Sequence, residues 1–236
     1  AAGGHNILLA GRPGAGKSML AKRLPTILPA MNRAEMIETT QIYSVLGLTT
    51  PDDPVVRVRP FRAPHHTVSN VAMSGGGSAL QPGEMSLADN GVLFLDELPE
   101  FSPAVLETMR QPLEDGSITI SRATGSVTYP SRFMLVCAMN PCKCGWYGHP
   151  SGRCRCSPRD VRRYHARVSG PLLDRIDIIV EVPALDFDEL TEPSAGESSE
   201  TIRARVNAAR AVQRARYGDD TTATNAHMWP RALARV

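Results

Sequence analysis

Consecutive apolar residues recur along the chain in short runs that end at glycine or polar residues. The runs occupy residues 6–10, 92–95, 133–139 and 178–182. Because neighbouring positions are apolar, rather than every second one, the pattern predicts strands that are buried on both faces. Each run is also shorter than a typical helix. We therefore expect these four strands to form the centre of the fold.

Helical patterns lie between and after these strands. They occupy residues 19–24, 35–46, 102–115 and 201–217. Pro25 and Pro29 should end the first of them, whereas Ser102 and Pro103 give the third a typical start and Gly116 a typical stop. Residues 51–90 are rich in proline, glycine and polar side chains, with strand-like pieces at 55–58 and 68–73. We expect this segment to be an insertion outside the core.

A third pattern precedes the run at 133–139. Residues 117–121 and 126–129 alternate between apolar and polar side chains on either side of residues 122–125. Alternation around a short turn containing glycine is typical of a β-hairpin. The sequence therefore predicts a hairpin with Arg122 near its tip, as a candidate contact to a polyanion.

Composition sets limits on these elements. The chain has 236 residues, enough for one large domain with part of a second. Its formal net charge is only +2, so the overall charge gives no argument for a nucleic-acid partner. No apolar run has the length of a membrane span and no signal peptide opens the chain. We expect a cytoplasmic protein with no membrane partner, whose five cysteines are thiols or metal ligands.

The first strand leads into a phosphate-loop motif, G-x-x-x-x-G-K-S. The residues expected to bind ATP are Gly11, Arg12, Pro13, Gly14, Ala15, Gly16, Lys17, Ser18 and Met19. Glycines let successive N–H groups point to one centre, and the following helix presents its positive end to the phosphates. Lys17 is predicted to reach the β- and γ-phosphates, and Ser18 to hold Mg²⁺.

The strands at 92–95 and 133–139 each end at polar side chains suited to hydrolysis. Asp96 is predicted to help hold Mg²⁺, and Glu97 to accept the proton of the attacking water. Asn140 can orient that water. Cys137 lies inside its apolar run and is expected to be inert core. The ends of these strands should converge with the phosphate loop on one site.

Two cysteine pairs follow Asn140. Cys142 and Cys144 form one C-x-C pair, and Cys154 and Cys156 form another. Four thiols on the short loop 141–157 predict structural, tetrahedral Zn²⁺, with His149 as a substitute ligand and four free thiols as the alternative. His65 and His66 are weaker candidates, because adjacent side chains are expected to point apart.

Several longer phrases resemble a known family. They are RPFRAPHHT, GGGSALQPGEMSLADNGVLFLDELPEF, MRQPLEDGSITISRA, AMNPCKCGWYGHP and RYHARVSGPLLDRIDI. Together with the phosphate loop they resemble the AAA+ ATPases, in the branch of the magnesium-chelatase subunits and MCM helicases, and within it the ComM/YifB family. The resemblance covers nearly all of residues 1–217.

This resemblance implies a three-layer α/β/α P-loop NTPase with a parallel sheet, inserted hairpins and the start of a helical lid. We expect an ATPase core at 1–190, a linker at 191–200 and a truncated lid at 201–236. In the family a Lon-protease-like domain precedes the core and the lid carries a second sensor arginine, so the chain is expected to be a weakly active fragment. The resemblance also implies a homo-hexamer in which Arg175 acts in trans as an arginine finger.

Three functions remain open at this stage. The first is an ATP-driven DNA motor for branch migration in natural transformation, with Arg122 as a DNA contact in the channel. The second is a magnesium-chelatase ATPase that drives insertion of magnesium into protoporphyrin. The third is a nucleotide-gated assembly module without enzymatic activity. Intact Asp96, Glu97 and Asn140 favour the first two, and the cysteine pairs favour the first.

Overall fold

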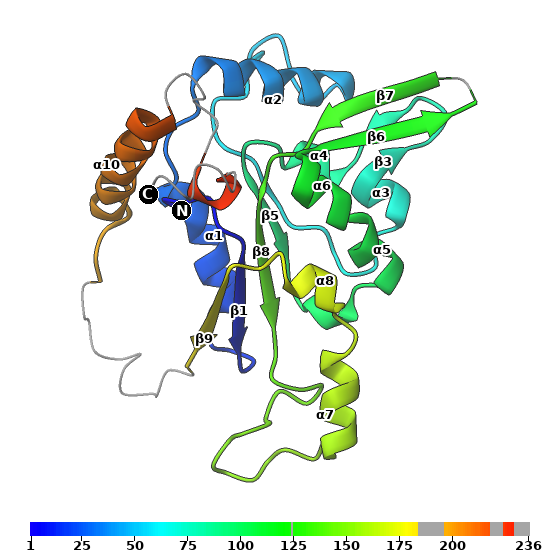
Figure 1. The fold of residues 1–236 in the computed structure, drawn as a ribbon, viewed down its shortest axis with the longest axis vertical. Coiled ribbons are helices and arrows are strands. Elements are labelled where there is room, and N and C mark those ends of the chain that lie inside the picture. The colour runs from blue at the N-terminus through cyan, green and yellow to red at the C-terminus, as the bar shows by residue number, and fades with distance from the viewer. Residues whose placement is uncertain (124, 184–195, 218–223, 229–236) are drawn as a thin grey trace.

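The structure is a computed structural model that describes residues 1–123, 125–183, 196–217 and 224–228. Its centre is a parallel sheet of five strands in the order β2-β5-β8-β1-β9 (Figure 1). The strands are β2 (Phe61–Arg62), β5 (Val92–Leu95), β8 (Met134–Met139), β1 (Ile7–Gly11) and β9 (Ile178–Val182). All four predicted strands are present, and the sheet is parallel as the resemblance implied.

Helices cover both faces of the sheet. They are α1 (Lys17–Ile27), α2 (Arg33–Val45), α3 (Asn70–Ser74), α4 (Glu84–Leu87), α5 (Pro103–Thr108), α6 (Arg110–Asp115), α7 (Pro158–His165), α8 (Gly170–Leu173) and α10 (Ser199–Tyr217). Short 3-10 helices lie at Leu98–Glu100 and Asn225–His227. The fold is thus the three-layer α/β/α arrangement that the resemblance implied.

Alternate residues of the central strands enter two separate cores. Leu93, Leu95 and Leu135 face a core completed by α4, α5 and α8, whereas Phe94 and Val136 face α1. A strand turns successive side chains to opposite faces, so a run that is apolar throughout fits a sheet covered on both sides. This is why the consecutive pattern predicted these strands correctly.

Several predicted helices have different limits. α1 continues through Pro25 as far as Ile27, so this proline does not end it. The prediction of a single helix over 102–115 is also wrong. The helical hydrogen-bond pattern is interrupted at Met109, which separates α5 from α6. The Met109 side chain is fully buried, and both short helices turn their apolar residues toward the same core.

The prediction that residues 51–90 lie outside the core is wrong. Met73 and Met85 are fully buried within the larger core. Residues 55–58 form no strand, and most of the predicted strand at 68–73 belongs to the helix α3. Ser69 caps the start of this helix, since its hydroxyl accepts a hydrogen bond from the Ala72 N–H at 3.1 Å. The few apolar side chains of residues 51–90 are spread among polar ones, so the sequence shows no periodicity that would mark them as buried.

Two hairpins project together from the sheet, at the upper right of Figure 1. The predicted one is β6 (Ser117–Arg122) with β7 (Gly125–Pro130), and the second is β3 (Gly75–Gly76) with β4 (Gln81–Pro82). The Tyr129 hydroxyl donates to the Leu80 carbonyl at 2.9 Å. A Cβ at Gly75 would lie 2.7 Å from the Ile120 side chain, so glycine permits this close packing.

The last strand differs from its prediction. β9 lies at the edge of the sheet beside β1, and Ile179 is 64% exposed. A consecutive apolar run therefore overestimated burial here. Beyond it, residues 191–195 of the predicted linker and residues 218–223 and 229–236 of the predicted lid lie outside the described residues.

The first part of the predicted lid is α10, which packs beside α1 (Figure 1). Its buried residues are Val206 and Gln213, and the Gln213 amide donates to the Ala2 carbonyl at 2.9 Å. None of the helices in the described part of the chain is long and apolar enough to cross a membrane.

Candidate functional site

The phosphate loop forms a tight turn between β1 and α1. Gly14 and Gly16 have φ angles of 82° and 81°, which side chains rarely adopt. Gly11 is required for another reason: a Cβ there would lie 2.5 Å from the Val182 carbonyl oxygen of β9. The loop borders an open pocket of about 360 Å³ at the carboxyl ends of the strands. The pocket is lined by Pro13, Gly14, Ala15, Gly16, Lys17, Ser18, Met19, Asp96, Glu97, Met139 and Asn140.

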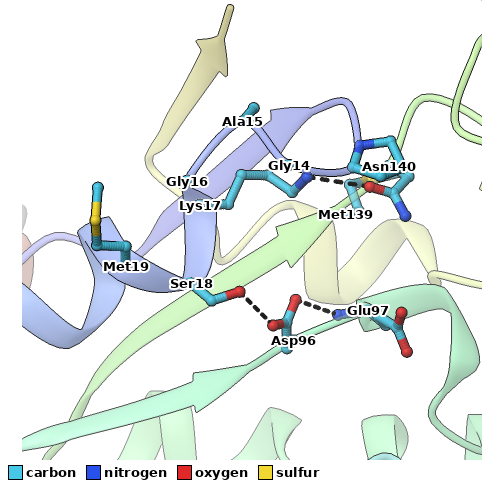
Figure 2. Close-up of a pocket in the computed structure, with 11 residues that line it drawn as sticks. Gly14, Ala15, Gly16, Lys17, Ser18, Met19, Asp96, Glu97, Met139 and Asn140 are labelled. Carbon is cyan, nitrogen blue, oxygen red and sulfur yellow. Dashed lines mark hydrogen bonds between the residues drawn. The ribbon is translucent and has the colours of Figure 1, made fainter. Parts of the chain in front are cut away.

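Lys17 spans the pocket from the first turn of α1. Its Nζ donates to the carbonyls of Gly11 and Arg12, each at 2.8 Å, and to Oδ1 of Asn140 at 3.0 Å (Figure 2). Burial lowers the pKa of Lys17, and the carboxylates of Asp96 and Glu97 oppose this shift. The ammonium group is therefore held between the phosphate loop and the end of β8.

Ser18 and Asp96 form an oxygen-rich edge of the same pocket. The Ser18 hydroxyl donates to Oδ2 of Asp96 at 2.5 Å (Figure 2). Hydroxyl and carboxylate oxygens are hard ligands of the kind that Mg²⁺ prefers. These two side chains therefore fit a Mg²⁺ ion bound together with phosphate.

Glu97 occupies a turn directly after β5. Its φ angle is 54°, in the left-handed region that a non-glycine residue seldom adopts. Its carboxylate points away from Ser18 (Figure 2), and its Oε2 lies 3.6 Å from Nδ1 of His66. Strained backbone of this kind is enriched at functional sites.

The contact between His66 and Glu97 was missed by sequence reasoning, which considered His66 only as a metal ligand. The expectation that the two histidines point apart is wrong, because the ring centroids of His65 and His66 are 4.0 Å apart. Both lie in a loop, where the alternation of a strand does not apply. The histidine pair itself was the only signal in the sequence.

Arg175 lies away from this pocket. Its guanidinium pairs with Glu114 of α6. Its carbonyl accepts a hydrogen bond from the Asn6 amide, at 2.8 Å, just before β1 begins. The phosphate loop follows the other end of β1, so the strand separates Arg175 from the pocket of its own chain.

The four predicted metal-ligating cysteines meet in one cluster. Their Sγ atoms all lie within 4.8 Å of one another. The distances from Cys142 to Cys144 and Cys154 are 3.4 and 3.9 Å, and from Cys144 to Cys154 it is 3.7 Å. With Zn–S bonds of about 2.3 Å, sulfur atoms at the corners of a tetrahedron are about 3.8 Å apart. The spacing of Cys142, Cys144 and Cys154 therefore fits tetrahedral zinc, and the fourth thiol, Cys156, lies within 4.8 Å of all three.

The other two candidate residues, His149 and Cys137, lie outside this cluster. His149 packs edge-on against Trp146, and its Nδ1 accepts a hydrogen bond from the Ser151 N–H at 2.8 Å, so it lies outside the four-sulfur group. Cys137 is fully buried, and burial raises its pKa. Its prediction as core is confirmed.

The cysteine loop, residues 141–157, touches the phosphate loop. Gly145 has a φ angle of 81°, and a Cβ on it would lie 2.5 Å from both Cδ and Cγ of Pro13. Gly148, in the same loop, has a φ angle of 76° but nothing within 4 Å of such a Cβ. The cysteine loop thus forms a wall against the turn that borders the pocket.

Comparison with known proteins assigns the family. The family described as magnesium chelatase, subunit ChlI, matches residues 1–190. The chain belongs to this family. It is an AAA+ family, so the domain is an AAA+ ATPase domain, for which ATP and Mg²⁺ are the expected ligands of the pocket.

Individual relatives support this assignment. YifB of Escherichia coli is 48% identical over 214 residues, covering 90% of this chain and 42% of YifB. Competence protein ComM of Haemophilus influenzae is 48% identical over 219 residues, covering 92% of this chain and 42% of ComM. A magnesium-chelatase 67 kDa subunit of Heliobacterium mobile is 25% identical over 87% of the chain, and the fission yeast replication licensing factor mcm7 is 27% identical over 79%. The chain spans less than half the length of YifB and ComM.

Proposed function

We propose that this domain binds and hydrolyses ATP as part of a ring-forming motor that acts on DNA. One observation carries the ATPase part of the proposal: Lys17, Ser18, Asp96, Glu97 and Asn140 line a single pocket. In this assignment Lys17 holds the β- and γ-phosphates, Asn140 orients water, and Glu97 accepts its proton. Mg²⁺, held by Ser18 and Asp96, would neutralise charge on the phosphates.

The position of Arg175 supports a ring. Its backbone lies beside Asn6, at the opposite end of β1 from its own pocket, which supports a role as a finger that acts in trans on the pocket of a neighbouring copy. A homo-hexamer is the assembly we propose, by analogy with the resembling motors. ATP then lies between subunits, and hydrolysis depends on assembly.

The DNA part of the proposal rests on the relationship to ComM and on the exposed hairpin that carries Arg122. The hairpin joins β8 at the end away from Asn140, so it does not adjoin the nucleotide pocket. The hairpin is connected to the pocket through other segments. β6 packs on β3, and β3 follows α3 in the chain. The loop before α3 holds His66 beside Glu97, which lines the pocket. Branch migration during natural transformation is the activity that we propose.

The decisive experiment is a branch-migration assay with the intact protein and a labelled four-way junction. We expect ATP-dependent conversion of the junction to products, and loss of conversion in Glu97→Gln although ATP is still bound. Products formed at the same rate without ATP, or no products with an active ATPase, would contradict the motor. Stimulation by a porphyrin and its partner subunits instead of DNA would favour the chelatase alternative.

Arg122→Ala tests the hairpin contact. In the intact protein it should reduce DNA binding and DNA-stimulated ATP hydrolysis several-fold, because one phosphate contact is lost, while basal hydrolysis stays near the wild-type rate. Arg57→Ala, which removes another exposed arginine elsewhere on the surface, is the control. Equal DNA stimulation in Arg122→Ala and wild type would remove the hairpin from the proposal.

We also propose that the cysteine cluster binds one structural Zn²⁺ per chain. Elemental analysis of protein purified without chelator should find about one zinc per chain, and the double variant Cys154→Ser/Cys156→Ser should lose it. Cys137→Ala should keep its zinc, since that thiol is buried in β8. Wild-type protein without zinc after growth in zinc-supplemented medium would refute the site.

Gly145→Ala tests whether the cysteine loop shapes the ATP site. A methyl group at this position displaces Pro13, so we expect ATP affinity in calorimetry to fall about tenfold, equivalent to about 1.4 kcal/mol. Gly148→Ala imposes similar backbone strain with no contact, and should bind ATP as wild type does. Equal losses in both variants would mean that strain in the loop, rather than contact with Pro13, is responsible.

A further inference from the structure

Positive charge is concentrated in the cysteine loop and the helix that follows it. Residues 141–165 contain six basic side chains and one acidic one, Asp160, which gives this segment a formal charge of +5. The rest of the chain, with 20 basic and 23 acidic residues, has a charge of −3. The small overall charge therefore conceals a strongly basic segment.

The six basic side chains form what we call the basic surface. They are Lys143, Arg153, Arg155, Arg159, Arg162 and Arg163, and all six are exposed. None of the six forms an ion pair with a described residue, whereas Arg59, Arg62, Arg132 and Arg167 all do. Unpaired, exposed guanidinium groups are available to an external anion.

The local structure holds this charge on one side. In α7, Val161 and Tyr164 are buried, so Arg159, Arg162 and Arg163, at spacings of three and four residues, lie on the opposite, exposed face. Within the loop, Lys143 and Arg155 are the middle residues of the two C-x-C pairs. His165 of α7 contacts the Pro141 carbonyl through Nε2 at 2.9 Å, which fixes the helix to the loop.

Planar side chains accompany the charge. The Arg153 guanidinium lies 5.1 Å from the centroid of the Trp146 ring, and the neighbouring Tyr147 is 52% exposed. Exposed aromatic rings beside arginines provide stacking surfaces for unpaired bases, while the arginines bind the backbone. A purely acidic protein partner would use the charge but leave the aromatic ring of Tyr147 without a role.

We propose that the basic surface binds the backbone of single-stranded DNA, as a contact distinct from the hairpin that carries Arg122. This inference rests on the proposed DNA motor and adds a second contact to it. The loop and α7 lie at the lower end of the molecule in Figure 1, and the β6–β7 hairpin lies at the upper right. The cysteine loop, which carries Lys143, Arg153 and Arg155, also touches the phosphate loop through the contact of Gly145 with Pro13. A strand bound along this loop would pass near the turn that borders the ATP pocket.

The test is the salt dependence of binding to fluorescein-labelled oligothymidylate, measured by anisotropy with the intact protein. The triple variant Arg159→Gln/Arg162→Gln/Arg163→Gln should bind at least about tenfold more weakly at low salt. The slope of log K against log salt should decrease in magnitude by about 2, since each lost single-strand phosphate contact contributes about 0.7. ATP affinity should be unchanged, because none of the three lines the pocket.

The matched control removes the same charge from α10. Arg203, Arg214 and Arg216 are also exposed, and their triple replacement by glutamine should leave affinity and slope unaltered. Tyr147→Ala should weaken binding of oligothymidylate but not of duplex DNA, with no change of slope, because stacking involves no counterion release.

Three outcomes overturn the inference. In the first, the triple variant of α7 binds oligothymidylate with the wild-type affinity and slope. In the second, the triple variants of α7 and α10 lose affinity equally. In the third, the α7 variant alters only ring assembly in sedimentation, which would indicate that the basic surface contacts an acidic neighbouring subunit. If the wild-type protein binds no DNA at all, the proposed motor fails as well. If Arg122→Ala loses DNA and the α7 variant does not, only the second contact is refuted.

Discussion

Replacing Lys17 with alanine should weaken ATP binding severely. In the wild-type protein the ammonium group is positioned by two carbonyls and Asn140, and the phosphates would be bound by a cation that is already held in place. Hydrogen bonds to charged groups contribute about 1.5–3 kcal/mol each, so the loss of Lys17 weakens ATP binding at least about 100-fold. Isothermal calorimetry with ATP and Mg²⁺ measures this directly.

Lys22→Ala is the control for this prediction. Lys22 lies on the same helix, α1, and is exposed, so its loss removes the same charge without touching the pocket. It should bind ATP as tightly as wild type. Equal ATP affinity in Lys17→Ala and Lys22→Ala would end the assignment of the phosphate loop.

Arg175→Ala should lower ATP turnover by about 10³-fold and leave ATP affinity intact. A guanidinium supplied by a neighbouring subunit stabilises charge on the transferred phosphate in the transition state, and its removal is costly only there. Turnover is measured at a protein concentration at which sedimentation shows the ring. Fast turnover by a proven monomer would contradict a finger that acts in trans.

The ion pair of Arg175 with Glu114 offers a second explanation that can be tested separately. If Arg175 serves only to hold α6, Glu114→Gln breaks the same pair and must cause the same loss of turnover. If Arg175 is the finger, Glu114→Gln leaves turnover near the wild-type value, because the guanidinium remains available to the neighbouring copy. The two variants together separate a structural role from a catalytic one.

Sequence patterns worked best where one physical requirement acts on consecutive residues. A strand covered on both faces must be apolar throughout, which identified β1, β5 and β8 with nearly correct ends. The same rule overestimated burial for β9, because strand propensity and apolar side chains do not reveal that a strand lies at the edge of the sheet. Segment 51–90 failed for the opposite reason. Its buried methionines are isolated among polar residues, and only their packing in the larger core of the folded domain shows that they are buried.

The sequence by itself determined which residues could bind phosphate and metal, because the phosphate loop, the acidic strand end and the cysteine pairs are local arrangements with fixed chemistry. Tertiary structure alone decided three further relationships. His66 contacts Glu97, Gly145 packs on Pro13, and Arg175 lies at the far end of β1 from its own pocket. Each of these three relationships involves segments that are distant in sequence. Which distant segments meet depends on the order of the strands in the sheet, and no local sequence pattern encodes that order.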